Sequence, residues 1–163
     1  MKPEDFQSYK PVWRDCLVGE YRGYRIISMP PPSSGGVHLI QALNVLSGFP
    51  LSESGHNGSK SLHVITETLR QVYADRSRWL GDPAFCQIPV EWLTSKDYAE
   101  QIRSQIPTER ARSSQDIQPG EPKSQTRGPG RSLATSLPYE SPQTTHFCVV
   151  DKDGMAVSIT YTL

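Results

Sequence analysis

The sequence predicts an α/β (α+β) fold, in which helices pack against a sheet. Residues 60–80 carry apolar side chains at helical spacing, which is typical of an amphipathic helix. Residues 144–162 are rich in β-branched and aromatic residues in two short runs, which is typical of paired strands. Because a sheet must cover its apolar face, a chain with both kinds of segment is expected to form layers of helix and sheet.

The composition disfavours several classes of function. The chain has 163 residues, enough for one domain, and its 17 basic and 17 acidic residues give zero formal net charge. This balance argues against nucleic acid and anionic membranes as partners. No apolar run is long enough to span a bilayer, and residues 1–10 lack the apolar core of a signal peptide.

The cysteines and histidines show no spacing typical of metal ligands. Cys16, Cys86 and Cys148 are odd in number and far apart, so we expect buried or inert thiols rather than a disulfide framework. The four histidines are scattered along the chain. The sequence therefore predicts no metal site.

A hairpin and a helix are predicted in the first part of the chain. Residues 17–29 read as two short strands around Arg22-Gly23. The motif PPPSSGG follows, and a helix over residues 36–47 comes next, with Ser33 or Ser34 as its cap and Gly48 at its end. We interpret PPPSSGG as a stiff connector, and the alternative is a role in peptide recognition or ligand binding.

Two further helices are predicted. Residues 60–80 form the stronger one, which Gly81-Asp82-Pro83 stops, and His63 beside its apolar stripe favours a structural role. A helix over residues 95–106 has Thr94 or Ser95 as its cap and ends before Pro107. The apolar stripe of the first helix consists of Leu62, Ile65, Leu69, Val72, Tyr73 and Trp79.

A polar stretch separates the helical part of the chain from the predicted strands. Residues 107–142 are rich in Pro, Gly and Ser and contain almost no large aliphatic residue. Such a stretch buries too little surface to offset the entropy lost on ordering. We therefore predict a mobile linker, with residues 120–136 as its loosest part.

A short loop sets the pairing of the two predicted strands, residues 145–151 and 155–162. Residues 152–154 fit a three-residue hairpin loop, with glycine in the place that needs a left-handed backbone. In this register Thr144 lies opposite Thr162, and directly opposed residues share one face of a sheet. A two-residue loop would point the two threonines to opposite faces.

The spacing alone favours an ordinary structural role for this threonine pair. Threonine becomes a nucleophile only when a base takes its proton, and no triad partner is visible nearby. A cut just before Thr144 would supply the base, because the freed α-amine has an unperturbed pKa of about 7.7–8.0 and is partly neutral near pH 7. A linker that ends at Gln143 is the context that such a cut requires.

Three long motifs resemble one enzyme family. They are PPPSSGG followed by VHLIQ, then YADRSRWLGDP, and then PYESPQTTHFCVVDKDGMAVSITYTL. Their length and order make the resemblance to the γ-glutamyltransferases (γ-glutamyltranspeptidases, glutathione hydrolases) specific. The resemblance implies an N-terminal nucleophile hydrolase fold, a layered αββα sandwich. It also implies a single precursor that cuts itself into a large and a small subunit.

The resemblance further implies roles for individual residues. Self-cleavage would fall between Gln143 and Thr144, so that Thr144 becomes the new N-terminus and the catalytic nucleophile. Thr144 would attack the γ-glutamyl carbonyl of glutathione or a related γ-glutamyl compound, and water or an acceptor amino acid or peptide would resolve the acyl-enzyme. Thr162 matches a threonine that supports the nucleophile and takes part in substrate binding. The resemblance implies no cofactor.

Under this resemblance the chain has three parts and belongs to a larger parent protein. Residues 1–106 correspond to the C-terminal part of the large-subunit region, residues 107–143 to the Pro/Gly/Ser-rich linker that ends at the cleavage site, and residues 144–163 to the hairpin that starts the small subunit. The parent protein is expected in the periplasm or outside the cell, although residues 1–163 include no signal peptide.

The chain also departs from the family pattern. Pro142 precedes Gln143 where other residues are common, and the linker is longer than usual. Most of the family's substrate pocket has no counterpart in residues 1–163, so we expect an enzyme fragment that is inactive by itself. Two alternatives remain open: a related amide acylase of the same superfamily, for example one that acts on β-lactam side chains, and a truncated, non-catalytic remnant.

Overall fold

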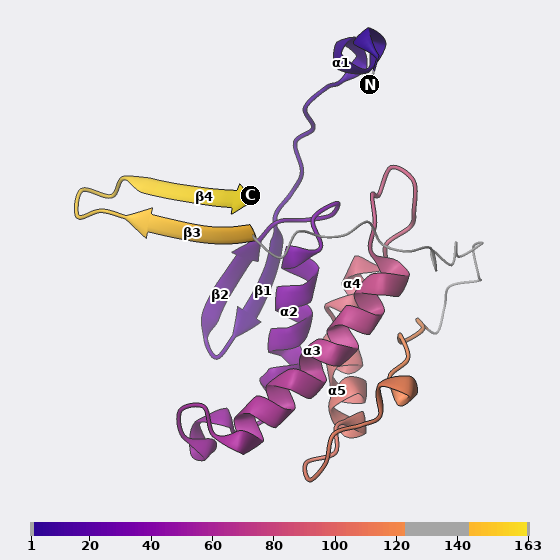
Figure 1. Ribbon diagram of the computed structural model, residues 1–163, viewed down its shortest axis with the longest axis vertical. Helices are drawn as coiled ribbons and strands as arrows, with labels where there is room; N and C mark the ends of the chain where they lie inside the picture. Colours follow the sequence, from indigo (N-terminus) through magenta and orange to yellow (C-terminus); the bar gives the residue numbers. More distant parts are fainter. Residues whose placement is uncertain (1, 123–143, 163) are drawn as a thin grey trace. The chain divides into compact units, whose positions relative to one another are not determined.

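Figure 1 shows the computed structural model of the chain, in which residues 2–122 and 144–162 are described. The chain divides into two compact units, residues 1–130 and residues 131–163. Helices dominate the first unit and a strand pair forms the second. The presence of both confirms the α+β class that the sequence predicts.

A β-hairpin precedes the main helices of the first unit. β1 (Leu17–Tyr21) pairs antiparallel with β2 (Tyr24–Ser28), as Figure 1 shows. Arg22 and Gly23 connect the strands with φ angles of 51° and 83°. Positive φ at both central residues is typical of the two-residue turn whose twist suits a hairpin. The hairpin predicted around Arg22-Gly23 is therefore confirmed.

The PPPSSGG stretch connects β2 to α2 (Gly35–Leu46). The Ser33 hydroxyl accepts a hydrogen bond from the Gly35 amide (3.3 Å), close to the predicted start of the helix. Gly36 is buried so close to the end of β2 that a Cβ there would lie 2.1 Å from the Met29 carbonyl oxygen. The motif thus forms the predicted connector, and its second glycine permits the close approach of helix and strand.

Three more helices build the core together with α2. They are α3 (Ser59–Trp79), α4 (Val90–Leu93) and α5 (Lys96–Gln105). α2 packs against β1, α3 and α5, which lie around it in Figure 1. The Ser95 side chain caps α5 by accepting from the Tyr98 amide (3.1 Å), as predicted. The main cluster of buried apolar residues consists of Val37, Val45, Leu93, Tyr98, Ala99, Ile102 and Ile106.

Short helical turns complete the first unit. They are α1 (Pro3–Ser8), η1 (Leu51–Ser54) and η2 (Ser114–Asp116). Within residues 2–122 and 144–162, no helix has the length and apolar character needed to cross a bilayer. The three cysteines are free and exposed, whereas the sequence predicts buried or inert thiols.

The face that α3 buries differs from the one that its apolar spacing predicts. Leu62, Leu69 and Tyr73 are exposed by 47%, 41% and 58%, so the predicted stripe is wrong at these positions. Most residues of the buried face are polar: Ser61, Val64, Glu67, Thr68, Gln71, Val72 and Asp75. The interior tolerates several of these polar side chains because they have hydrogen-bond partners on α2, on α5 and in residues 107–122.

Residues 107–122 lie against the helices, which differs from the mobile linker predicted over this stretch. The Arg112 guanidinium donates to the Glu67 carboxylate of α3 (2.7 Å). His63 Nε2 donates to the Pro107 carbonyl (2.7 Å), which agrees with the structural role predicted for this histidine. Polar contacts hold the stretch, whereas the prediction considered only apolar burial. Residues 120–136 are predicted to be the loosest part of the linker. Most of them (residues 123–136) lie outside the described part of the chain.

The second unit is an antiparallel strand pair. β3 spans Thr144–Val150 and β4 spans Ala156–Thr162. The strands predicted over residues 145–151 and 155–162 are therefore confirmed to within one residue at each end.

Candidate functional site

The turn between β3 and β4 fixes the register of the candidate site. The Asp151 amide donates to the Met155 carbonyl (3.0 Å), and the Gly154 amide donates to the Asp151 carbonyl (3.1 Å). Gly154 has a φ of +85°, the left-handed conformation that the three-residue loop requires. The Asp151 side chain strengthens the turn because its Oδ1 accepts from the amides of Asp153 and Met155, both at 2.9 Å. The predicted loop is confirmed, although the sequence analysis missed this role of the Asp151 carboxylate.

The register pairs Thr144 with Thr162, at the end of the hairpin opposite the turn. The intervening pairs include Val149 with Val157 and Phe147 with Ile159. This pairing confirms the predicted register and excludes the two-residue loop. Gln143, the residue before the proposed cleavage point, lies outside the described residues.

One face of the hairpin carries a polar cluster that the sequence analysis did not single out. His146 Nδ1 lies 2.8 Å from Thr160 Oγ1, and its Nε2 lies 3.3 Å from Ser158 Oγ. The Cys148 Sγ lies 3.4 Å from both His146 Nε2 and Ser158 Oγ. His146 and Cys148 are two residues apart on β3, so the alternation of a strand puts them on one face. That period of two is the sequence signal that could have identified them.

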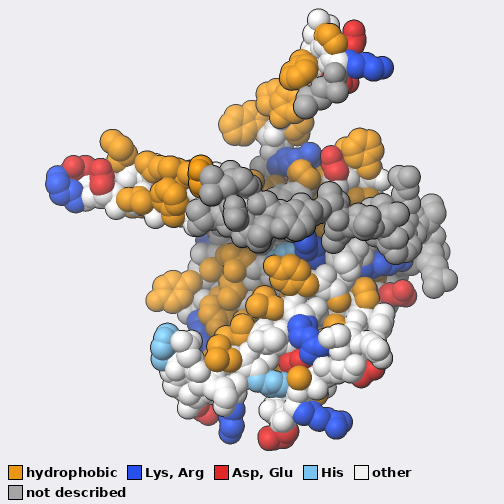
Figure 2. Space-filling model, viewed as in Figure 1, with side chains coloured by type: hydrophobic (Ala, Val, Ile, Leu, Met, Phe, Trp, Pro, Cys, Tyr) orange, Lys and Arg blue, Asp and Glu red, His pale blue; other side chains and the backbone are white. Residues whose placement is uncertain are grey.

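The opposite face of the hairpin is apolar. Phe147, Val149, Val157 and Ile159 are exposed by between 40% and 54%. Figure 2 shows hydrophobic side chains along the β3–β4 hairpin and charged side chains at its turn, where Lys152 and Asp153 pair. The hairpin is therefore amphipathic, with its polar cluster on one face and apolar side chains on the other.

A buried carboxylate forms a second polar centre, inside the first unit. Asp75 of α3 is 1% exposed, and its carboxylate accepts hydrogen bonds from Gln41 Nε2 (2.6 Å) on α2 and the Tyr98 hydroxyl (2.8 Å) on α5. It also accepts from Gln71 Nε2 (3.3 Å) and the Gly120 amide (2.9 Å). Four donors thus converge on one carboxylate, which links three helices and the segment that follows α5.

Burial perturbs the titration of this centre. It raises the pKa of Asp75 above its ordinary value, and the hydrogen bonds from Gly120, Tyr98, Gln41 and Gln71 oppose the rise. Burial also raises the pKa of Tyr98, and the adjacent Asp75 charge raises it further. Tyr98 therefore stays protonated and donates its hydroxyl hydrogen to the carboxylate.

Glu67, two turns before Asp75 on α3, takes part in a buried ion pair. Glu67 is 1% exposed and binds both Arg70 and Arg112, and Arg112 Nε lies 2.7 Å from its Oε2. Burial by itself would raise the pKa of Glu67, but hydrogen bonds and charges from Arg112 and Arg70 outweigh it and lower the pKa. Glu67 is therefore ionised at neutral pH, and it holds Arg112 against α3.

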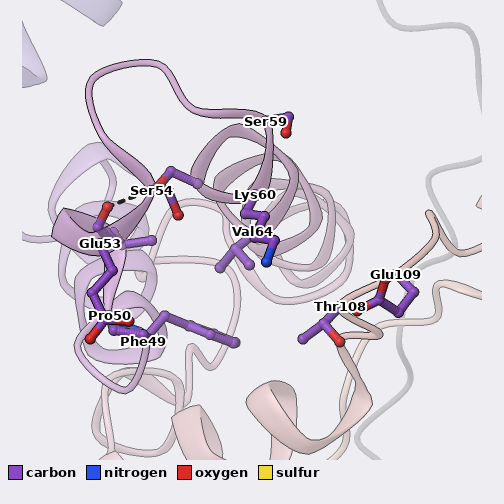
Figure 3. Close-up of a pocket in the computed structure, with 11 residues that line it drawn as sticks. Phe49, Pro50, Glu53, Ser54, Ser59, Lys60, Val64, Thr108 and Glu109 are labelled. Carbon is purple, nitrogen blue, oxygen red and sulfur yellow. Dashed lines mark hydrogen bonds between the residues drawn. The ribbon is translucent and has the colours of Figure 1, made fainter.

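One hollow of the first unit is separate from both centres. It has a volume of about 660 Å³ and lies where η1, the start of α3 and the residues after α5 meet (Figure 3). Glu53, Lys60 and Glu109 give it a mixed charge, and Phe49 and Val64 supply its apolar part. None of the predicted site residues lines it. In the described part of the chain, His, Cys, Asp and Glu side chains form no group of three that could hold a metal ion.

A hairpin whose first strand begins with a threonine, in a chain of mixed α and β structure, fits the class of N-terminal nucleophile hydrolases. Comparison with known proteins supports this class. A curated glutathione hydrolase proenzyme of Escherichia coli (strain K12) is 46% identical over 160 residues, which cover 98% of this chain and 25% of that protein. The acylase ACY 1 proenzyme of Pseudomonas sp. (strain SE83) is 38% identical over 159 residues, with the same coverage. The crystal structure of Helicobacter pylori γ-glutamyltranspeptidase matches 72% of this chain and 34% of its own, with a TM-score of 0.70 and 50% identity.

The sequence profile of the family described as gamma-glutamyltranspeptidase matches residues 1–163. The chain therefore belongs to the γ-glutamyltranspeptidase family, as its motifs predict. It spans about a quarter of the length of the curated relatives that it matches.

Proposed function

We propose that the protein containing this chain is a γ-glutamyltransferase that becomes active by cutting itself between Gln143 and Thr144. The observation that carries this proposal is the pairing of Thr144 with Thr162 at the open end of β3–β4, in a chain of the γ-glutamyltranspeptidase family. Thr144 is the nucleophile of both self-cleavage and catalysis. Thr162 supports it and contributes to substrate binding.

In the uncut chain, Thr144 directly follows Gln143, so its hydroxyl is next to the carbonyl group that it attacks in self-cleavage. Its Oγ1 attacks the carbonyl carbon of Gln143, and the peptide C–N bond breaks as an ester C–O bond forms. The hydroxyl proton ends on the nitrogen of Thr144, which becomes a free α-amine. Water then hydrolyses the ester, which leaves a carboxyl group on Gln143 and restores the Thr144 hydroxyl. The relatives named proenzymes support a step of this kind.

The same oxygen then performs the transfer reaction. The free α-amine of Thr144 accepts the hydroxyl proton while Oγ1 attacks the γ-carbonyl of a γ-glutamyl compound such as glutathione. The γ-amide C–N bond breaks, and the proton passes to the leaving amine. Water or the amine of an acceptor amino acid or peptide then attacks the ester and releases the γ-glutamyl group. Neither step requires a cofactor.

The two products of self-cleavage remain partners in this proposal. Residues up to Gln143 belong to the large subunit, and residues from Thr144 onward begin the small subunit. We also propose that the parent protein acts in the periplasm or outside the cell, as the family resemblance implies.

A second candidate function is the hydrolysis of other amides by the same nucleophile. The observation that favours it is the 38% identity with the acylase ACY 1 proenzyme over nearly the whole chain. Both functions use Thr144 in the same way, so they differ only in the acyl group that the parent protein binds.

Substrate turnover by the full parent protein distinguishes these functions. We expect release of p-nitroaniline from γ-glutamyl-p-nitroanilide, its loss in Thr144→Ala, and no release from amides that lack the γ-glutamyl group. Hydrolysis of cephalosporin side-chain amides without γ-glutamyl turnover would favour the acylase. Turnover that Thr144→Ala leaves intact would refute both.

A further inference from the structure

The polar cluster of the β3–β4 hairpin consists of two cross-strand pairs. The register places His146 opposite Thr160 and Cys148 opposite Ser158. Directly opposed residues of an antiparallel pair share one face, so a thiol, an imidazole and two hydroxyls meet there. All four side chains are exposed. The proposed function uses none of them.

The Cys148 thiol lies within hydrogen-bond reach of a base. Its Sγ is 3.4 Å from His146 Nε2. The thiolate, not the thiol, is the nucleophilic form of cysteine, and an adjacent imidazole that takes the proton favours this form. His146 is therefore in place to accept the Cys148 proton at Nε2.

Thr160 holds the other nitrogen of the imidazole. His146 Nδ1 is 2.8 Å from Thr160 Oγ1. When Nδ1 carries the ring proton and donates it to this hydroxyl, Nε2 keeps its lone pair for Cys148. The three side chains thus have the order of nucleophile, base and orienting group that activated nucleophiles share.

The ion pair that proton transfer creates has a partner for each of its polar atoms. The His146 imidazolium donates from Nδ1 to Thr160 and from Nε2 to the Cys148 thiolate. The thiolate also accepts from the Ser158 hydroxyl, whose oxygen is 3.4 Å from Sγ. Hydrogen bonds to the charged form of a group favour that form. Because water also reaches this exposed cluster, we expect an effect of a few-fold rather than many orders of magnitude.

The other two cysteines provide references for this arrangement. Cys16 and Cys86 are exposed, as Cys148 is. The Cys86 thiol donates to the Asp82 carbonyl (3.2 Å). Among the described residues, neither Cys16 nor Cys86 is hydrogen-bonded to a histidine.

We propose that Cys148 is a reactive thiol, which His146 activates and Thr160 helps to position, and that it forms mixed disulfides with small polar disulfides. The Cys148 thiolate attacks one sulfur of the disulfide, whose S–S bond breaks as the new S–S bond forms, and the departing thiolate takes the proton from His146. Cys148 is oxidised, and one half of the disulfide is reduced to a thiol. Small polar disulfides fit because the thiol is exposed beside hydroxyl groups. The proposal does not depend on the proposed function.

Alkylation of the native parent protein tests the activation. Iodoacetamide at pH 7, followed by peptide mapping with mass spectrometry, gives the rate at each cysteine. A free thiol with its unperturbed pKa of about 8.5 is only a few per cent thiolate at this pH, and a thiolate that forms more readily is also less nucleophilic. We therefore expect Cys148 to react about three- to ten-fold faster than Cys16 and Cys86, and His146→Gln to abolish the difference. An unchanged rate in His146→Gln would overturn the activation.

Two variants of Thr160 keep the test decisive if His146→Gln disturbs the hairpin. Thr160→Val removes the hydroxyl that bonds Nδ1, so the alkylation of Cys148 should slow by roughly two-fold or more. Thr160→Ser keeps a hydroxyl and should restore the wild-type rate. Equal rates in the two variants would contradict the positioning role of Thr160.

Oxidised glutathione is the probe for the disulfide reaction itself. Intact mass and peptide mapping of the native parent protein should show a glutathionyl group on Cys148 before any appears on Cys16 or Cys86, and dithiothreitol should remove it. The adduct should form more slowly in His146→Gln. A Cys148 that stays unmodified, or that reacts no faster than the other two cysteines, would refute the modification site.

Discussion

Thr144 and Thr162 occupy directly opposed positions in the β3–β4 ladder. Cross-strand partners of an antiparallel pair lie on the same face, with Cβ atoms roughly 4.5–5.5 Å apart. Their pairing depends on a turn near the other end of the hairpin, where Gly154 has a positive φ and Asp151 accepts two amides. A loop distant from the threonines thus determines that they occupy paired positions in the ladder.

Replacing Thr144 should affect cleavage and turnover together. Thr144→Ala removes the one oxygen that both steps use, so we expect no cut at Gln143–Thr144 and no γ-glutamyl turnover in the parent protein. Thr144→Ser keeps the hydroxyl but loses the methyl group that restrains its rotamer, so some of each activity should remain. Mass spectrometry gives the N-terminus of the small subunit. An uncut but fully active parent, or a small subunit that starts elsewhere, would contradict the mechanism.

Replacing Thr162 should slow the reaction without changing the stability of the fold. Thr162→Val has nearly the same shape but no hydroxyl, and valine suits a strand at least as well as threonine. We expect the unfolding midpoint to stay unchanged and the rate of the chemical step to fall. Thr162→Ser, which keeps a hydroxyl at this position, is the control for the substitution itself. Equal kcat in Thr162→Val and the wild type would show that Thr162 does not support the nucleophile.

The two glycines of PPPSSGG should differ sharply in their tolerance of a side chain. A Cβ at Gly36 would lie 2.1 Å from the backbone oxygen of Met29, whereas a Cβ at Gly35 would make only an ordinary contact. We expect Gly36→Ala to destabilise the fold by about 1–3 kcal/mol, because the junction of β2 and α2 must move. Gly35→Ala should have little effect. Urea unfolding of both variants tests this, and equal stabilities would show that the junction adapts.

The Glu67–Arg112 pair should make stability depend on pH in the acid range. Since the folded state lowers the pKa of Glu67, the pair stabilises the fold above the unfolded-state pKa of about 4.3, and this contribution disappears as pH falls through the lower folded value. Glu67→Gln should therefore cost about 1–3 kcal/mol at pH 7 and clearly less at pH 3. Urea unfolding at both pH values gives the difference.

An exposed glutamate provides the control for this pH effect. Glu100 lies on α5, is exposed and has no ion-pair partner among the described residues. Glu100→Gln should change stability by less than about 0.5 kcal/mol at either pH. A Glu67→Gln cost that is the same at pH 3 and pH 7 would mean that the pair contributes no pH-dependent stability.

Local patterns were sufficient to predict both hairpins and the register of the threonine pair. Arg22-Gly23 and residues 152–154 each place glycine where the turn needs a positive φ, so the turn chemistry is present in the residues themselves. The starts of α2 and α5 could also be predicted, because Ser34 is the N-cap residue of α2 and Ser95 caps α5 by accepting from the Tyr98 amide. These features depend on neighbours in the sequence, which is why the sequence determines them by itself.

Only the tertiary structure decided which face of α3 is buried and where the chain after α5 lies. The periodicity favoured Leu62, Leu69 and Tyr73, yet Glu67 and Asp75 are in the interior. A buried carboxylate is stable only when donors surround it, and those donors come from α2, α5 and Gly120, which are distant in sequence. Such partners leave no periodic signal, because each is a single polar residue whose place depends on how the helices pack.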